Sequence, residues 1–190
     1  AAHQQKNDSH NGNEEYNWFL AVLFPASQLT ILPYNRFVVD FNGHSEQDLI
    51  AALRKVGELL PTDDPTPDRP GTFGVHLNDQ WYTLCLDEAT IDWADPIASL
   101  DVSLLQDRVL GPVLGITDPR TDSRIKFIGG IRGTEALESA TQSGGIAFAM
   151  SPTSIAQLLD VADTGACMPP KSTWFEPKLR SGLSKQTDGD

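Results

Sequence analysis

One stretch near the end of the chain gathers groups that bind anions. After Pro169 and Pro170, which fix two successive φ angles, an ammonium group and two hydroxyls follow in consecutive residues. Lys and Arg bind phosphate and carboxylate strongly, and hydroxyls add further donors. The segment from Ala166 to Lys185 holds four basic residues and one acidic residue, whereas the whole chain has a formal net charge of −12. The candidate anion ligands in this stretch are Lys171, Ser172, Thr173 and Lys178.

The same stretch supports a second interpretation. Trp174 and Phe175 supply apolar bulk directly after the hydroxyls. A loop of this composition can insert its aromatic rings into the core while its charged groups point to water, because basic clusters are common on protein surfaces. The residue types alone do not decide between an anion site and a structural loop, so both hypotheses stay open.

A glycine-rich turn forms a second candidate site. A strand expected over 124–128 leads into Gly129, Gly130 and Arg132, and Thr134 is expected to cap a following helix. Glycines permit close approach of the backbone, and a strand followed by a helix N-terminus suits an anion. The spacing fits neither the Walker A motif nor the dinucleotide-binding motif, and a tight structural turn explains the glycines equally well.

Arg36 is a further candidate, because it lies between apolar segments. It is either an anion ligand or the partner of a carboxylate at the edge of the core.

No residue pattern in the sequence indicates another kind of chemistry. The acidic segment from Asp87 to Asp95 offers oxygen ligands for Mg²⁺ without fixed geometry, and no Cys/His set has zinc spacing. We therefore predict no metal site. Cys167 is interpreted as a structural residue, and we assign no catalytic residue or general base.

These residues must be positioned by alternating strands and helices. Apolar runs, alternation and helical periodicity predict an α+β fold with a mixed β-sheet and helices packed mainly on one face. His76 is expected on the strand face opposite the apolar residues, facing solvent or a cross-strand partner. The expected strands are 18–24, 29–32, 37–41, 72–77, 80–86, 124–128 and 145–150; the expected helices are 45–60, 101–110, one beginning after Thr134 and one from about 152 to 164, with Ser45, Asp101, Thr134 and Ser151 as N-caps.

Length and charge narrow the class of protein. We expect a polar leader over 1–15, a single α+β domain over 16–183 and a polar tail over 184–190. The negative net charge argues against nucleic acid and anionic membranes as partners, and no apolar run approaches the roughly 20 residues of a membrane span. Two cysteines favour a reducing, cytoplasmic setting. The chain does not begin with Met, which suggests that an upstream part is missing.

Four sequence blocks in order resemble one protein family, over about Trp18 to Leu183. The family is bacterial and archaeal and is catalogued as domain of unknown function 1015. The blocks are Leu32-Pro-Tyr-Asn-Arg36, Lys126-Phe-Ile-Gly-Gly-Ile-Arg132, Ser151-Pro-Thr-Ser-Ile155 and Met168-Pro-Pro-Lys-Ser-Thr-Trp-Phe-Glu-Pro-Lys178.

The resemblance implies that this chain is the C-terminal part of a longer protein. Family members carry an upstream half with an Asp-Gly-His-His-Arg motif that looks like the phosphate-contacting motif of ParB/sulfiredoxin-like domains, some of which use nucleotides. That motif is absent here. The implied function is to help bind a small phosphorylated or carboxylated metabolite, or a nucleotide, in a phosphotransferase-type protein whose upstream half is the partner. The alternative is an anion-binding, regulatory or structural module without enzyme activity.

Overall fold

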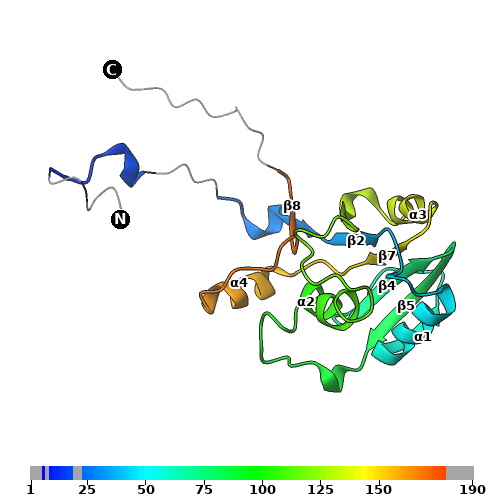
Figure 1. Cartoon of the computed structure of the whole chain (residues 1–190). Coiled ribbons are helices and arrows are strands. Elements are labelled where there is room, and N and C mark those ends of the chain that lie inside the picture. Colours follow the sequence, from blue (N-terminus) through cyan, green and yellow to red (C-terminus); the bar gives the residue numbers. More distant parts are fainter. Residues whose placement is uncertain (1–5, 7–8, 19–22, 179–190) are drawn as a thin grey trace.

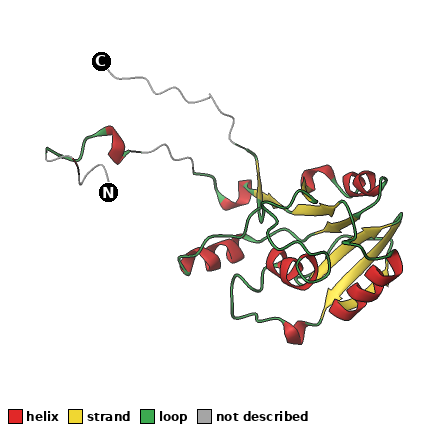
Figure 2. Cartoon of the chain, viewed as in Figure 1, coloured by secondary structure: helices red, strands yellow, loops and turns green. Residues whose placement is uncertain are grey.

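The computed structural model describes residues 6, 9–18 and 23–178, and it confirms the α+β class (Figures 1 and 2). A six-stranded sheet has the order β3-β5-β4-β7-β2-β6, and each of its pairings is antiparallel. A separate two-stranded sheet pairs β1 with β8. The expected tail over 184–190 lies outside the described residues, as does part of the expected leader.

The elements of the described chain have the following bounds. The strands are β1 (Thr30–Leu32), β2 (Tyr34–Val38), β3 (Gly57–Pro61), β4 (Thr72–Leu77), β5 (Gln80–Leu86), β6 (Ile125–Gly129), β7 (Ile146–Ala149) and β8 (Trp174–Glu176). The helices are α1 (Glu46–Val56), α2 (Asp101–Leu105), its π-helical continuation η5 (Gln106–Leu110), α3 (Glu135–Thr141) and α4 (Ile155–Asp163). Short 3-10 turns are η2 (Glu15–Asn17), η3 (Ala26–Gln28), η4 (Glu88–Thr90) and η6 (Gly130–Arg132).

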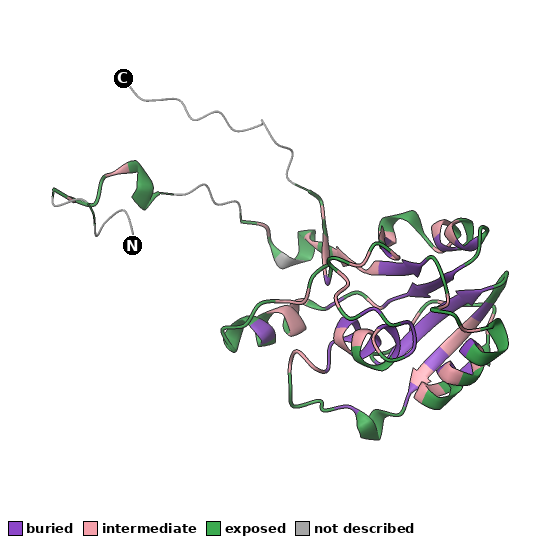
Figure 3. Cartoon of the chain, in the orientation of Figure 1, coloured by how far each residue is buried: buried purple, intermediate pink, exposed green. Residues whose placement is uncertain are grey.

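The six-stranded sheet separates two apolar layers, because successive side chains of a strand point to opposite faces. Val38 of β2 belongs to the larger core cluster, which also contains Leu53 of α1, Leu105 of α2 and Val161 of α4. Its neighbour Phe37 belongs to the smaller cluster with residues of α3. The buried segments follow the strands and the inner sides of the helices (Figure 3). The prediction that helices pack mainly on one face is therefore confirmed, and α3 covers the other face.

Several local predictions are confirmed by specific contacts. The Ser45 hydroxyl accepts a hydrogen bond from the backbone N–H of Asp48, as an N-cap does. Asn78 and Asp79 have φ values of 47° and 57°, which is the conformation that a two-residue hairpin turn requires. His76 is buried at 3% exposure and lies opposite Trp81 on β5, so the cross-strand alternative holds and the solvent alternative does not.

The predicted helix over 45–60 is wrong in its last four residues. Helix α1 ends at Val56, and the next five residues form β3, an edge strand paired with β5. A side chain on Gly57 would collide with the Cys85 carbonyl, so this glycine allows the two strands to approach. Leu59 is buried and Leu60 is 52% exposed, which is the alternation of a strand. The prediction extended the helix too far because, over so few residues, the leucines fit both the helical period and the strand period.

Two predicted caps and one predicted strand are also corrected. Leu100, and not Asp101, occupies the N-cap of α2. Helix α4 begins after Ser154, whose hydroxyl forms a capping box with Gln157, and not after Ser151. The strand expected over 37–41 is β2, which begins three residues earlier and ends at Val38.

The buried strand expected over 18–24 is not supported by its described ends. Residues 19–22 lie outside the described chain, but Trp18 is 71% exposed and Leu23 is 93% exposed. The strand expected over 29–32 is β1, which pairs with β8.

Candidate functional site

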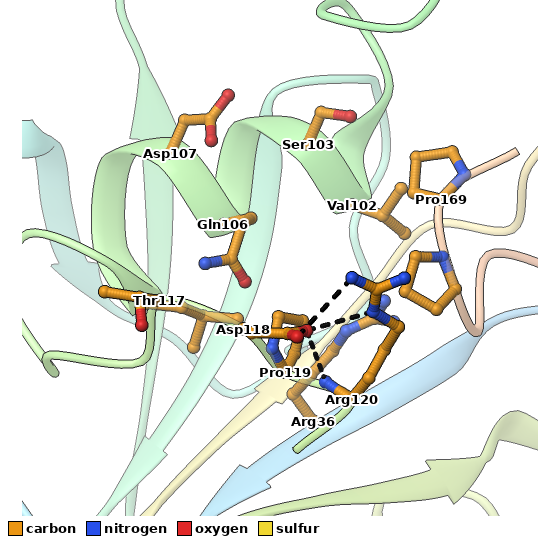
Figure 4. A pocket seen from close by; sticks show the side chains of 12 residues that line it. Arg36, Val102, Ser103, Gln106, Asp107, Thr117, Asp118, Pro119, Arg120 and Pro169 are labelled. Atoms are coloured by element: carbon orange, nitrogen blue, oxygen red, sulfur yellow. Dashed lines mark hydrogen bonds and ion pairs between the residues drawn. The ribbon is translucent and has the colours of Figure 1, made fainter. Parts of the chain in front are cut away.

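A cavity of about 440 Å³ lies where β2, the α2–η5 helix and two loops meet (Figure 4). Arg36 contributes from β2, the first loop contributes residues 117–120, and the second contributes Pro169 and Pro170. The polar groups on this cavity come from distant parts of the sequence. They are Arg36, Ser103, Gln106, Asp107, Thr117, Asp118 and Arg120.

Arg36 places a buried positive charge at this cavity. The residue is 4% exposed, and it forms no ion pair with any described residue. Its Nη1 donates to the Tyr34 carbonyl, and its Nη2 donates to the Lys171 carbonyl at 3.2 Å. Burial lowers the pKa of Arg36 to about 10, so the guanidinium remains charged at pH 7. Of the two sequence-based alternatives for Arg36, pairing with a carboxylate at the core edge is therefore wrong within the described chain.

Lys171 is joined to Arg36 through its backbone. Its φ of 56° lies in the left-handed region, which is uncommon for residues other than glycine, and Arg36 holds its carbonyl in place. The Lys171 ammonium lies 5.3 Å from the centroid of the Tyr34 ring. Lys171 lines a second cavity of about 370 Å³, together with Arg120 and Pro170, which also line the first. Two of the predicted anion ligands are thus adjacent, although 135 residues separate them in sequence.

Arg120 is the cationic side chain that sequence reasoning missed. Its Nε lies 3.1 Å from Oδ1 of Asp118, and the two side chains form an ion pair at the rim of the first cavity (Figure 4). The Arg120 side chain is 70% exposed, so solvent weakens this pair. The sequence offered one signal, an Asp-Pro-Arg turn, but nothing in that turn indicates that it packs against Pro169 and Pro170.

The hydroxyls predicted beside Lys171 have other partners or another location. Ser172 is buried at 5% exposure, and its hydroxyl donates to the Pro169 carbonyl. This bond closes the proline turn. Thr173 lines a third cavity of about 510 Å³ at the β1–β8 sheet, together with Lys178. The Lys178 ammonium lies 3.3 Å from the centroid of the Trp174 ring.

The glycine-rich turn has a packing explanation. A side chain on Gly129 would collide with the Trp174 ring, and one on Gly130 would collide with Pro33. The Gly130 N–H already donates to the Pro33 carbonyl at 2.8 Å. Arg132 is exposed on η6 and lines none of the three cavities described here. The structure thus brings Arg36 and Lys171 together and places Thr173 and Lys178 at a different cavity. The other predicted ligands line none of these cavities; they are Ser172, Gly129, Gly130 and Arg132.

Two features are absent from the described residues. No group of three or more His, Cys, Asp or Glu side chains there is arranged to hold a metal ion. No helix in the described part of the chain has the length and apolar character needed to cross a membrane.

Comparison with solved structures finds similarity to free serine kinases. The chain resembles a free serine kinase in complex with AMP at 10% identity and a TM-score of 0.46. It also resembles a mutant free serine kinase in complex with ADP at 14% identity and a TM-score of 0.44. In both cases 78% of this chain and 54% of the other chain are covered, so this chain spans about half the length of these structures. No curated protein matches.

Comparison with family models supports the sequence resemblance. The model described as "Protein of unknown function (DUF1015)" matches residues 1–103, which include the Leu32–Arg36 block. The three blocks after residue 103 lie beyond this match. Because the match covers more than half of the 190 residues, the chain belongs to the DUF1015 protein family.

Proposed function

We propose that this chain binds a small phosphorylated or carboxylated metabolite, or a nucleotide, in the cavity at Arg36. The observation that carries the proposal is the buried guanidinium of Arg36, which lines a cavity and has no carboxylate partner in the described chain. A buried charge without a counter-charge is costly. An anionic ligand would offset that cost, and a guanidinium is well suited to phosphate and carboxylate.

Two further cations support an anion at this place. Arg120 lines the same cavity, and Lys171 lines the adjoining one. Lys171 also holds a left-handed backbone conformation, and such strain is often found at functional sites. A ligand with two anionic groups could therefore contact Arg36 with one group and Lys171 with the other.

The proposed role is in phosphoryl transfer. That reaction depends mainly on positioning and on neutralising negative charge, so cations alone can contribute to it. We assign no general base. The family resemblance implies an upstream ParB/sulfiredoxin-like half, and we propose that this half completes the site. A cytoplasmic location stays a prediction from cysteine usage.

A structural role is the second candidate, and one observation favours it. Arg36 donates to the carbonyls of Tyr34 and Lys171, so its charge also ties the proline turn to β2. In that case the cations would stabilise the fold or form a regulatory module without catalysis. The Lys171 ammonium would then contact only the Tyr34 ring and solvent.

Thermal unfolding with added anions separates the two candidates. The probes are inorganic phosphate, phosphoserine, serine, ADP and ATP. A ligand at about 100 times its dissociation constant stabilises the folded state by about 2.7 kcal/mol, which raises the midpoint measurably. The proposal predicts such a rise for at least one anion, and a smaller rise in Arg120→Ala and Lys171→Gln.

Arg54→Ala is the matched control, because Arg54 is exposed on α1 and lines none of the three cavities. It should respond to the anion as the wild type does. If no probe raises the midpoint of the wild type, the anion site is refuted for this chain and the structural role remains. If Arg54→Ala weakens the response as much as Arg120→Ala does, the anion acts through net charge and not through the cavity.

A further inference from the structure

One residue that lines the cavity at Arg36 carries a buried acceptor oxygen that receives no hydrogen bond from the described chain. The Oε1 atom of Gln106 is buried, and no donor of the described chain forms a hydrogen bond with it. Buried polar atoms are nearly always hydrogen-bonded in proteins, so each exception requires an explanation. Gln106 lines the same cavity as Arg36 and Arg120.

The orientation of the Gln106 amide is fixed by its other end. Its Nε2 donates to the Ile116 carbonyl at 2.7 Å. Rotating the amide by half a turn would place Oε1 against that carbonyl oxygen, so the two acceptors would repel. The amide nitrogen must therefore face Ile116, and the oxygen must face the other way. In Figure 4 the side chain projects from its helix toward the loop that carries Asp118 and Arg120.

The backbone at Gln106 is also unusual. Gln106 begins the π-helical turn η5, in which the Gly111 N–H donates to the Gln106 carbonyl five residues earlier. Single π-helical turns occur frequently at functional sites. Three residues of this turn, Gln106, Asp107 and Leu110, line the cavity.

We propose that the ligand of this cavity carries a hydrogen-bond donor beside its anionic group, and that Gln106 Oε1 accepts from that donor. The inference rests on the proposed anion site. It narrows the ligand class to hydroxylated or amino-substituted phosphates and carboxylates, with Gln106 as a specificity-determining residue. The two acidic residues of the cavity, Asp107 and Asp118, are less suitable as acceptors for this donor. Asp118 already accepts from Arg120, and the Asp107 carboxylate points away from the Asp118–Arg120 loop in Figure 4.

Paired ligands that differ only in their hydroxyl groups test this inference by isothermal titration calorimetry. Glycerol 3-phosphate is compared with propyl phosphate, and glycolate is compared with acetate. One net hydrogen bond corresponds to roughly a three- to tenfold difference in dissociation constant. The wild type should bind the hydroxylated member of at least one pair tighter by that factor.

Gln106→Met removes the acceptor at similar side-chain length. The ratio between the paired ligands should fall to about one, while affinity for the donor-free ligand is retained. A purely structural role of Gln106 would weaken both ligands equally and leave the ratio unchanged. The exposed Gln142→Met is the control and should keep the wild-type ratio.

The outcomes separate the two proposals. Binding of both members of each pair with equal affinity by the wild type overturns this inference and leaves the anion site standing. Binding of neither member overturns both. A ratio that persists in Gln106→Met overturns the assignment to Gln106.

If that variant does not fold, the Gln106 side-chain carbonyl carbon is followed by nuclear magnetic resonance in the wild type. Its resonance should shift with glycerol 3-phosphate and not with propyl phosphate, and equal shifts overturn the assignment.

Discussion

Asp101 carries a buried carboxylate whose ionisation opposes folding. Its residue exposure is 9%, and its Oδ1 accepts a hydrogen bond from the Gly71 N–H at 2.7 Å. It forms no ion pair with the described residues. Burial raises the pKa of Asp101 from 3.8 to about 6, and the Gly71 hydrogen bond opposes this rise only in part. The folded state therefore binds the proton more tightly than the unfolded state does.

The magnitude follows from this pKa. Each pKa unit corresponds to about 1.4 kcal/mol, so a fully protonated Asp101 stabilises the fold by about 3 kcal/mol relative to the ionised form. This contribution is fully present below pH 3.8 and is lost as the pH rises through about 6. Between pH 4.5 and pH 7 the single-site linkage relation gives a loss of about 2 kcal/mol.

Asp101→Asn isolates the effect, because the amide oxygen can still accept from Gly71 but carries no charge. We expect the variant to gain about 2 kcal/mol relative to the wild type when the pH is raised from 4.5 to 7. Urea unfolding followed by circular dichroism at the two pH values measures this difference. The exposed Asp68→Asn serves as the control and should show no such change. A difference between Asp101→Asn and the wild type that does not depend on pH would refute the reasoning.

Three further predictions concern packing and capping, and urea unfolding measures each of them. Leu137→Ala empties a fully buried position on α3 and should cost about 2–5 kcal/mol, whereas a loss below 1 kcal/mol would contradict close packing of α3 on the sheet. Ser154→Ala removes the capping box of α4 and should cost about 1 kcal/mol, and an unchanged midpoint would mean that the box contributes nothing. Gly129→Ala should cost about 1–3 kcal/mol and change the fluorescence of Trp174, because its Cβ collides with that ring; retained stability and fluorescence would show that the ring can move aside.

The sequence predicted the elements whose cause is local. Ser45 begins α1 because its hydroxyl reaches a backbone N–H three residues later. Asn78 and Asp79 form a hairpin turn because they tolerate a left-handed backbone. The sequence also singled out Arg36 and Lys171, since a basic residue among apolar segments and a proline-stiffened cationic loop are unusual.

Tertiary structure decided where those residues lie. The edge strand β3 exists because β5 offers it a partner, and periodicity cannot reveal that partner. The Arg36–Lys171 contact spans 135 residues, and Arg120 and Gln106 line the cavity at Arg36 because the fold brings their loop and helix there. The sequence by itself identified Arg36 and Lys171 as candidate anion ligands, and it did not indicate Arg120. The fold decided which of them meet, because the burial of Arg36 and its lack of a carboxylate partner in the described chain depend on residues distant in sequence. The Gln106 amide is oriented by the Ile116 carbonyl, which the loop after η5 brings back to it.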